Sequence, residues 1–403
     1  MRTTIVSPSI LEISDAAAGL TGWLSVDSIV DHHCCGGLRM LPDVSPVELA
    51  ELARAMTLKH AFLGLPHGGA KAGIVYDEGR RKREKPMLLT AFGRGIEDLL
   101  RSRVYLPGAD MGTSGEEIRK MMETVGIRVP KRALAGKRSG WYTGLTVVAS
   151  VKAAAVHQGL DLSKATVAIE GFGGVGSAVA ENVRKLGSSV VAVSTYDGAL
   201  HDPKGLDIDR LIQCSRQHGS RMVDFFDGRK IHRESLLELD VDVLIPCARH
   251  HSINLENVSR IRARLVGCGA NVPATKEAEK LLWERGILCV PDFVANAGGV
   301  LGGTMEFAGI RPSKIAQFMD TFYLRQVSSL IRTARKEGVY IRDKAEAVAA
   351  ERWARVKRAS DKRSLRNGVF SLGLELYRNG WIPSALVARL GWKYFQSRIE
   401  GRM

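Results

Sequence analysis

The pattern of hydrophobic positions predicts one long helix in the first part of the chain. Apolar residues recur at helical spacing over residues 46–63. Ser45 is placed to act as the N-cap, and Pro46 suits the first helical turn. Gly64 ends the helix, and the segment after it contains Gly68, Gly69 and Gly73. We expect this segment to be a loop whose backbone can approach a ligand closely.

From about residue 145 the pattern changes to short apolar runs that alternate with stretches of helical spacing. The short runs predict buried strands at residues 165–169, 190–193, 241–245 and 264–266. Helices are predicted at 147–156 and at 177–186. Strands that alternate with helices form a parallel sheet that is covered on both faces, so we expect an α/β fold. After Phe307 the pattern is mostly helical.

One glycine motif lies between the first predicted strand and the helix that follows it. Gly171-Phe172-Gly173-Gly174-Val175-Gly176 matches the dinucleotide-binding pattern G-x-G-x-x-G, in the context that this pattern requires. Gly171 would make the tight turn, Gly173 would let the backbone approach a pyrophosphate, and Gly176 would let the helix pack closely on the strand. We expect Gly171, Gly173, Gly174, Val175 and Gly176 to bind NAD.

An acidic residue after the second strand bears on the choice between NAD and NADP. Asp197 lies just past that strand, at the distance of about 20 residues where an acid binds the ribose hydroxyls of NAD. Asp197 therefore favours NAD. Thr195 and Tyr196 precede it, so that NADP stays open.

Composition places the chain among ordinary globular proteins. It has 403 residues, of which 45% are hydrophobic and 25% are charged, so two domains are expected. No apolar run reaches the roughly 18 residues of a membrane span. Glu12 and Asp15 interrupt the region where a secretory signal needs an apolar core, so we expect a cytoplasmic protein. The six cysteines include no C-x-x-C pair and are expected to be reduced thiols.

Positive charge is concentrated at the end of the chain. The formal net charge is +15, and residues 351–403 hold 12 lysines and arginines against 4 acidic residues. Such an end can attract nucleic acid or an anionic membrane. Because the basic residues are scattered rather than blocked, a solvated helical surface is favoured. We expect no membrane and no nucleic-acid partner, and we interpret the basic helix at 386–395 as an oligomer contact or a docking arm.

Further segments occur in a fixed order around the glycine motif. They are Gly36-Gly37-Leu38-Arg39-Met40, Met56-Thr57-Leu58-Lys59, Leu65-Pro66-His67-Gly68-Gly69-Ala70-Lys71, Gly108-Ala109-Asp110-Met111-Gly112-Thr113, Gly269-Ala270-Asn271, and Pro291-Asp292 followed by Asn296-Ala297-Gly298-Gly299-Val300. The ordered set resembles the glutamate/leucine/phenylalanine/valine dehydrogenase superfamily over roughly residues 20–355.

The resemblance implies a domain plan and a reaction. Residues 1–138 would form an α/β substrate-binding and oligomerisation domain, and residues 139–329 a doubly wound Rossmann domain, with a cleft between them. The helices in 330–403 would pack back onto the first domain, and the protein would be a homo-oligomer. The implied reaction is the NAD(P)-dependent oxidative deamination of an L-amino acid to a 2-oxo acid and ammonium.

Matched positions imply the site residues. Lys71 resembles the catalytic lysine, Asp110 the catalytic aspartate, and Lys59 the lysine that binds the substrate α-carboxylate. We expect Lys59 to lower the pKa of Lys71, since like charges disfavour protonation. The remaining substrate-binding positions are Cys35, Gly36, Gly37, Met56, Asn271, Val300 and Gly303. Besides the glycine motif and Asp197, the cofactor-binding positions are Thr143, Ala248 and Asn296.

Two positions depart from the glutamate-specific pattern. Glutamate-specific members carry a lysine before the Gly-Gly pair and a serine three residues after the valine of Asn-Ala-Gly-Gly-Val; here these positions are Cys35 and Gly303. A buried carboxylate without partners costs on the order of several kcal/mol. We therefore expect an apolar or aromatic substrate. Glutamate dehydrogenase with an altered anchor, and a non-catalytic cofactor-binding regulatory protein, remain as alternatives.

Two runs of metal-ligating residue types also depart from the family pattern. They are His250-His251 and His32-His33-Cys34-Cys35. Neighbouring side chains of an extended segment point to opposite faces, and adjacent histidines do not have the usual spacing of zinc ligands. We therefore expect both runs to line pockets and expect no metal.

Overall fold

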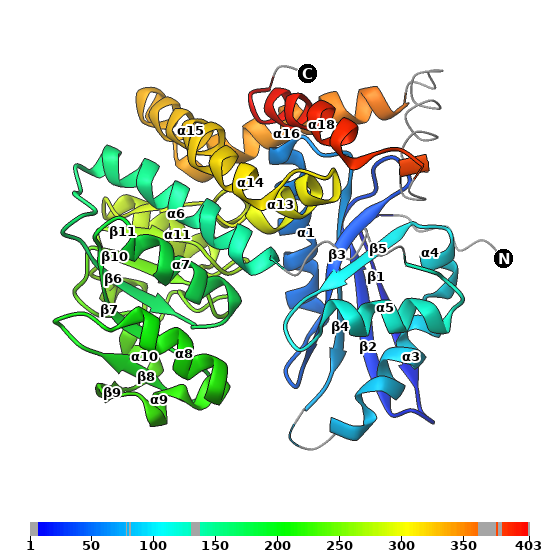
Figure 1. Ribbon diagram of the computed structural model, residues 1–403, viewed down its shortest axis with the longest axis horizontal. Helices are drawn as coiled ribbons and strands as arrows, with labels where there is room; N and C mark the ends of the chain where they lie inside the picture. Colours follow the sequence, from blue (N-terminus) through cyan, green and yellow to red (C-terminus); the bar gives the residue numbers. More distant parts are fainter. Residues whose placement is uncertain are drawn as a thin grey trace.

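The structure is a computed structural model that describes residues 7–77, 79, 82–129, 138–361, 376–377 and 381–401. Two lobes stand side by side, and a group of helices joins them at one end (Figure 1). The first lobe is built on a five-stranded sheet and the second on a seven-stranded sheet. The α/β class predicted from the sequence is confirmed.

The sheet of the first lobe has the strand order β1-β2-β4-β3-β5. Its strands are β1 (Ser9–Asp15), β2 (Leu20–Val26), β3 (Cys34–Leu41), β4 (Gly68–Val75) and β5 (Tyr105–Ala109). β1, β2 and β4 pair antiparallel, whereas β3 pairs in parallel with both β4 and β5. The carboxyl ends of β3 and β5 therefore lie at the same edge, which brings Asp110, just after β5, next to β3.

Helix α1 (Pro46–Leu63) covers one face of this sheet. Ser45 is its N-cap and accepts a hydrogen bond from the Glu48 N–H at 3.2 Å, and Gly64 ends it in the left-handed conformation, with φ of 65°. Both ends are those that the sequence predicts. The other helices of this lobe are α3 (Lys85–Gly95), α4 (Glu97–Arg101) and α5 (Gly115–Thr124).

The glycine-rich segment after α1 is a strand, so its prediction as a loop is wrong. Gly68, Gly69 and Gly73 lie in β4, the central strand of the sheet. A Cβ atom on Gly69 would lie 2.3 Å from the Thr57 backbone nitrogen of α1. The glycines are needed because α1 packs against the strand backbone. From the sequence alone, glycine indicates only that the backbone can adopt many conformations.

The second sheet has the strand order β12-β11-β10-β6-β7-β8-β9. Its strands are β6 (Thr166–Glu170), β7 (Ser189–Ser194), β8 (Ala199–His201), β9 (Arg229–Ile231), β10 (Val243–Pro246), β11 (Leu265–Gly267) and β12 (Leu288–Val290). The strands from β12 to β7 are parallel, and β8 and β9 extend the sheet antiparallel. The order reverses at β6, which is where Rossmann folds bind their ligand.

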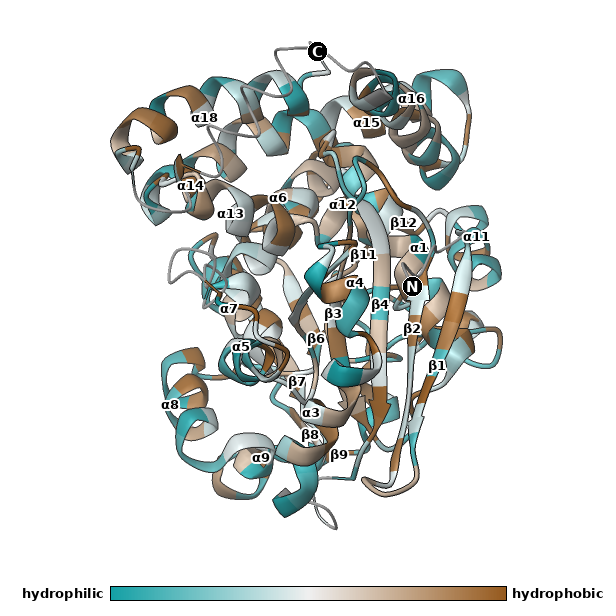
Figure 2. Ribbon diagram, turned by 90° about the vertical axis from the view of Figure 1, so that its right-hand side faces the viewer, coloured by the Kyte–Doolittle hydropathy of each residue, from teal (hydrophilic) through white to brown (hydrophobic). Residues whose placement is uncertain are grey.

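Helices cover both faces of the second sheet. They are α6 (Ser139–Gln158), α7 (Gly174–Arg184), α8 (Ile208–His218), α9 (Met222–Phe225), α10 (Arg233–Leu236), α11 (Lys276–Glu284) and α12 (Asp292–Ala295). The predicted strands and the helix after the glycine motif are present, with ends that differ by one to three residues, whereas α6 begins eight residues before the predicted helix at 147–156. Brown apolar segments of the strands lie in the interior, and teal segments lie on the outer helices (Figure 2).

The C-terminal helices contact both lobes: some pack on α6 of the second lobe, and the last ones pack on α1 of the first. They are α13 (Gly298–Phe307), α14 (Pro312–Phe318), α15 (Leu324–Glu337), α16 (Ile341–Asp361) and α18 (Ser384–Ile399). Arg352 of α16 donates to the Phe62 carbonyl, and Arg398 of α18 donates to the Gly64 carbonyl at 2.7 Å. Both bonds hold the end of α1. Within the described residues, no helix has both the length and the apolarity to cross a bilayer.

Candidate active site

Alternation along two neighbouring strands places the candidate residues on one face of the first sheet. In β4, Gly69 and Gly73 face α1, since a Cβ on either would touch that helix. Lys71 lies between them and shares their face, because strand side chains alternate. In β3, Arg39 faces the same way, as its contacts show, and Cys35 and Gly37 share its face. The candidate site residues of β3 and β4 therefore share one face because residues two apart along a strand point the same way.

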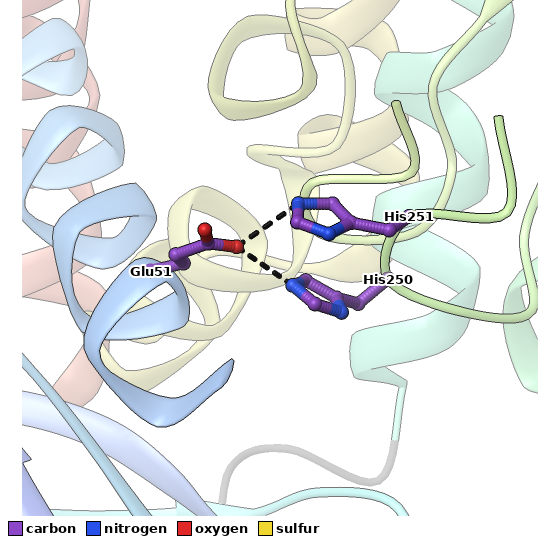
Figure 3. Close-up of side chains that lie close together, drawn as sticks. All are labelled: Glu51, His250 and His251. Carbon is purple, nitrogen blue, oxygen red and sulfur yellow. Dashed lines mark hydrogen bonds and ion pairs between the residues drawn. The ribbon is translucent and has the colours of Figure 1, made fainter. Parts of the chain in front are cut away.

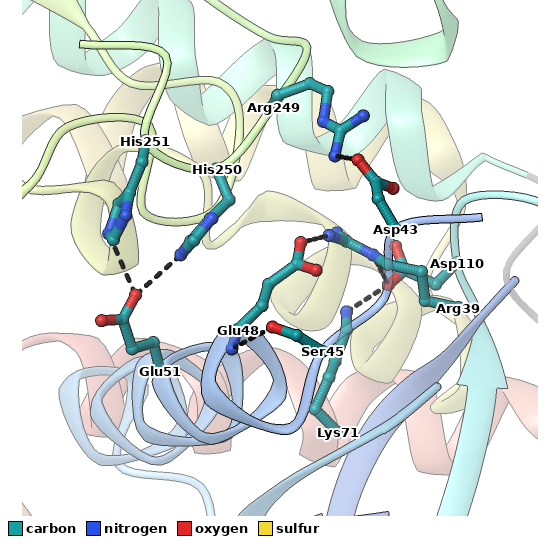
Figure 4. A network of polar contacts seen from close by, with 10 residues as sticks. All are labelled: Arg39, Asp43, Ser45, Glu48, Glu51, Lys71, Asp110, Arg249, His250 and His251. Atoms are coloured by element: carbon teal, nitrogen blue, oxygen red, sulfur yellow. Dashed lines mark hydrogen bonds and ion pairs between the residues drawn. The ribbon is translucent and has the colours of Figure 1, made fainter. Parts of the chain in front are cut away.

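Lys71 and Asp110 form a buried ion pair. The Lys71 ammonium contacts Asp110 Oδ2, and the Arg39 guanidinium reaches the same oxygen at 3.3 Å. Arg39 also pairs with Glu48 of α1 (Figure 4). The space for Asp110 depends on Gly37, because a Cβ on Gly37 would lie 2.8 Å from the Asp110 Cβ. Lys71, Asp110 and Gly37, which are all predicted from the sequence as site residues, therefore lie together in the structure.

Burial and charge set the protonation of this pair. Burial lowers the pKa of Lys71, Asp110 raises it, and the positive charge of Arg39 lowers it further. Burial would raise the pKa of Asp110, but Lys71 and Arg39 outweigh it and hold that pKa at about 2. The sequence predicts Lys59 as a cation that acts on Lys71, and the two lysines do repel each other; Arg39 is a further cation that lowers the pKa of Lys71.

Lys59 makes the contact between the lobes at the site. Its Nζ donates to Asn271 Oδ1 at 2.9 Å, from α1 in the first lobe to the loop after β11 in the second. Asn296 donates to the same oxygen at 3.3 Å, which fixes it as an acceptor. Burial lowers the pKa of Lys59 to about 8, and Lys71 lowers it while Asp292 and Asp110 oppose the change. Lys59 therefore holds its proton less tightly than a free lysine does.

The other predicted substrate-binding residues lie on three elements, β3, α1 and α13. Cys35 and Gly36 lie in β3, Met56 in α1, and Val300 and Gly303 in α13. Tyr105 donates its hydroxyl to the Gly36 carbonyl at 3.0 Å, which fixes the strand there. Burial raises the pKa of Cys35, so its thiol stays neutral. A Cβ on Gly303 would meet no atom within 4 Å, so this position has room for a side chain.

The glycine motif has the geometry of a pyrophosphate site. Gly171 has φ of +88°, and a Cβ there would lie 2.9 Å from Ala248, so the loops after β6 and β10 meet. A Cβ on Gly176 would lie 1.9 Å from the Gly171 carbonyl, whereas one on Gly173 would meet nothing within 4 Å. Gly174 and Val175 form the first turn of α7, whose N-terminus is therefore open to an anion.

Two further atoms bear on whether a dinucleotide fits. Among the described residues, the amide oxygen of Asn296 is buried and has no hydrogen-bond partner. Such an atom calls for a donor from a ligand, because an unpaired buried acceptor is costly. Thr143 of α6 lies against α13, and a Cβ on Gly299 would be 2.9 Å from its Oγ1. The residues present therefore fit a dinucleotide that crosses from α7 to Asn296.

Asp197 lies at the far end of this path, in the turn between β7 and β8. The turn is closed by a bond from the Thr195 N–H to the Gly198 carbonyl at 2.7 Å, and Asp197 is exposed within it. Arg233 lies over the Tyr196 ring, 5.5 Å from its centroid, and donates to the Tyr196 carbonyl. An acid and a guanidinium therefore both flank the position where a ribose would end.

Sequence reasoning missed two members of the site. Arg39 lies within a quoted motif, but its role was not assigned, and Glu48 looks like an ordinary first-turn acid of a helix. Arg39 could have been predicted because it lies two residues after Gly37 in the same strand, so that both residues share one face. Glu48 becomes visible only when α1 is packed on the sheet.

Family comparison agrees with this geometry. Residues 138–361 match the family described as Glutamate/Leucine/Phenylalanine/Valine dehydrogenase. The chain belongs to this family. Residues 3–126 match its companion, the Glu/Leu/Phe/Val dehydrogenase dimerisation domain. The amino acid dehydrogenase family suggested by the ordered motifs is thus confirmed.

Known relatives of this amino acid dehydrogenase include proteins named for glutamate. A glutamate dehydrogenase of Thermotoga maritima is 34% identical over 302 residues, 71% of this chain and 72% of the relative. An NAD-specific glutamate dehydrogenase of Staphylococcus aureus (strain COL) is 36% identical over 284 residues, 68% of each chain.

Solved structures support the same fold. The hetero-hexameric glutamate dehydrogenase of Thermus thermophilus, in a Leu-bound form, has a TM-score of 0.75 at 28% identity and covers 88% of this chain and 90% of its own. An L-tryptophan dehydrogenase from Nostoc punctiforme has a TM-score of 0.59 at 23% identity, covering 87% of this chain and 96% of its own. The latter likeness concerns the fold alone.

Proposed function

We propose that this dehydrogenase carries out the NAD-dependent oxidative deamination of an apolar or aromatic L-amino acid in the cleft between its lobes. The observation that carries the proposal is the buried Lys71–Asp110 pair beside the Lys59–Asn271 contact. This arrangement combines two lysines whose pKa is lowered with a carboxylate that stays ionised. The products are a 2-oxo acid and ammonium.

The charge of each site residue suggests its role in the reaction. Lys59 would hold the substrate α-carboxylate as a fixed positive partner, with Asn271 and Asn296 orienting the ammonium. Nicotinamide, when bound, supplies the acceptor for the hydride from the substrate α-carbon. Lys71, with its lowered pKa, would take a proton from the water that attacks the imine carbon. Asp110 would pass protons to and from the substrate nitrogen.

The choice of side chain rests on Cys35 and Gly303. The cationic residues buried at the site are already paired: Arg39 with Glu48 and Asp110, Lys71 with Asp110, and Lys59 with Asn271. A glutamate γ-carboxylate at Cys35 would therefore lack a charged partner, which costs several kcal/mol by order of magnitude. A neutral thiol and the open space at Gly303 suit an apolar chain.

Glutamate remains the second candidate. The curated relatives of Thermotoga maritima and Staphylococcus aureus are named glutamate dehydrogenases, at 34% and 36% identity. Their names favour the same reaction class with a carboxylate side chain. The two substrates differ in what they require of positions 35 and 303, so these positions can be tested directly.

The double variant Cys35→Lys with Gly303→Ser tests the side-chain proposal. It should raise kcat/KM for glutamate relative to leucine and phenylalanine by about tenfold or more, because a charge-assisted partner is worth about 1.5–3 kcal/mol. Cys214→Ser, on α8, serves as the control. A wild-type enzyme that already prefers glutamate, with a preference that the double variant does not change, would overturn the proposal.

NAD is proposed as the cofactor on the strength of Asp197. An acid at the end of the ribose path binds the two hydroxyls and repels a 2′-phosphate. The Staphylococcus aureus relative is named NAD-specific. Asp197→Ser should lower the ratio of NAD to NADP efficiency by about tenfold, since the repulsion is removed while Arg233 remains. An unchanged ratio would place the discriminating residue elsewhere.

A homo-oligomer is proposed from the edge of the first sheet. β1 ends the strand order, so the backbone groups of its outer edge have no neighbouring strand among the described residues. Edges of this kind pair with a second chain unless they are protected. Light scattering should give a mass that is a multiple of 44.0 kDa; a monomer at micromolar concentration would contradict the proposal.

A further inference from the structure

Three side chains with metal-ligating atoms meet where the two lobes contact each other, apart from the ion pairs of Lys71 and the hydrogen bond of Lys59. Glu51 lies on α1, and His250 and His251 lie in the loop after β10 of the second lobe (Figure 3). Glu51 Oε2 is 2.7 Å from His250 Nε2 and 3.0 Å from His251 Nε2. Both imidazoles thus point at one oxygen atom.

Adjacent side chains usually diverge, and a backbone feature makes these two converge. His251 has φ of +55°, in the left-handed region that non-glycine residues seldom adopt. The rings stack with centroids 3.6 Å apart and planes 21° apart. The His251 N–H bonds to the Val272 carbonyl at 2.8 Å, which holds the turn. Unfavourable backbone conformations that persist in this way concentrate at functional positions.

The three donor atoms suit a divalent transition ion. All lie within 4.8 Å of one another. Four-coordinate zinc has bonds of about 2.0–2.2 Å, which place its ligand atoms roughly 3.4 Å apart. The present N–O separations of 2.7 and 3.0 Å would need to open by about 0.7 and 0.4 Å to reach this spacing. Two imidazoles and a carboxylate are a frequent zinc ligand set, with water in the fourth place.

The surrounding charges leave room for a cation. The nearest guanidinium of the loop, Arg249, is paired with Asp43 at 2.5 Å. Arg39 is likewise paired with Glu48, one turn before Glu51 on α1 (Figure 4). The carboxylate of Glu51 contacts only imidazoles among the ion pairs of the described residues. A divalent ion would therefore meet an acid whose charge is not already balanced by an arginine.

We propose that Glu51, His250 and His251 form a binding site for zinc or a chemically similar divalent ion that links the two lobes. The ion replaces the imidazole N–H protons that otherwise face Glu51. Because its ligands come from both lobes, a bound ion holds the lobes in the relative arrangement seen here. It is an inhibitory clamp, since substrate and product must enter and leave through the same cleft.

The test is a calorimetric titration of the full-length protein with Zn²⁺. Metals are first removed with a chelator and dialysis, and a non-chelating reductant is present throughout. We expect one site per chain. His250→Ala, His251→Ala and Glu51→Gln should each weaken it by about tenfold or more, as loss of a ligand does. His232→Ala, an exposed histidine outside the cluster, is the control and should leave the site unchanged.

Two further readouts separate the clamp from unspecific binding. Co²⁺ should give the absorption of a four-coordinate ion in the wild type and lose it in Glu51→Gln, a variant of the same shape that keeps the fold. At one Zn²⁺ concentration, the rise in Tm should be larger for the wild type than for each of the three variants, since the stabilisation by a ligand depends on its affinity for the folded state. Absence of the site, or a site that all three variants retain, would overturn the proposal and leave the cluster an ion-pair contact.

Discussion

The ammonium nitrogen of Lys59 lies 2.9 Å from the amide oxygen of Asn271, although the two residues belong to different lobes. The contact requires the lobes to face each other as they do here. Asn296 donates to the same oxygen, so the acceptor is fixed before a substrate arrives. A substrate carboxylate at Lys59 therefore meets a preset position, which lowers the entropy cost of binding.

Lys59 and Lys71 should give different kinetic defects. Lys71→Met should lower kcat by about 10²–10⁴-fold, the usual contribution of a general base. Lys59→Met should mainly raise KM for the amino acid, since it removes a partner of the ground-state carboxylate. Steady-state kinetics at several pH values measure both. Lys120→Met, an exposed lysine of α5, is the matched control; equal defects in kcat and KM for both site variants would contradict the separation of roles.

The rate should rise with pH as Lys71 loses its proton. Burial and Arg39 lower the pKa of Lys71 from its ordinary value, so the rise should come below the range of a free lysine. In Arg39→Gln the repulsion is gone and the pKa of Lys71 should increase, which moves the rising limb of kcat/KM to higher pH by about 1 unit. Arg54→Gln on the exposed side of α1 is the control. A limb that stays in place, or moves to lower pH, would rule out Arg39 as the tuning residue.

Acid should cost the protein the stability that Asp110 supplies. The folded pKa of about 2 lies below the unfolded value of 3.8, so this stability is complete above pH 3.8 and is lost as pH falls towards 2. The difference in unfolding free energy between wild type and Asp110→Asn should therefore shrink by about 2 kcal/mol over that window. Urea denaturation at successive pH values measures it, with Asp240→Asn, at an exposed position before β10, as control. A difference that is independent of pH would contradict the pairing.

Val272 should be a site of conformational strain. Its φ of +47° is in the left-handed region, where an L-residue loses about 1–2 kcal/mol. Its N–H bonds to Asp292 Oδ2 at 3.0 Å and its carbonyl accepts from His251, which hold it there. Val272→Gly should raise Tm, with a net gain of roughly 1 kcal/mol after the entropy cost of glycine. Val272→Ala keeps the Cβ and should not; equal destabilisation by both would disprove the strain.

Local patterns predicted what depends on neighbours in sequence. Ser45, Pro46 and Gly64 bound α1 because capping needs only adjacent residues. The parallel sheet and the motif at Gly171 followed in the same way from alternation and glycine spacing. The lysines and Asp110 were found through the ordered family motifs rather than through physics alone.

What failed depends on packing between distant segments. Gly69 was placed in a loop because its closeness to Thr57 of α1 is invisible in the sequence. Arg39 was not recognised as a cation beside Lys71 because its partners lie just after β5 and on α1. The convergence of His250 and His251 on Glu51 depends on one positive φ and on closure of the cleft. These contacts join segments that are far apart in the chain, which local spacing does not specify.

The most direct measurement of the central claim is NADH formation at alkaline pH across the twenty L-amino acids, with NADP in parallel and Lys71→Met beside the wild type. The account predicts turnover of an apolar or aromatic amino acid with NAD, little turnover of glutamate, and loss of activity in Lys71→Met. No turnover of any amino acid, despite NADH binding at the glycine motif, would contradict the account and favour a regulatory protein that keeps the fold without the reaction.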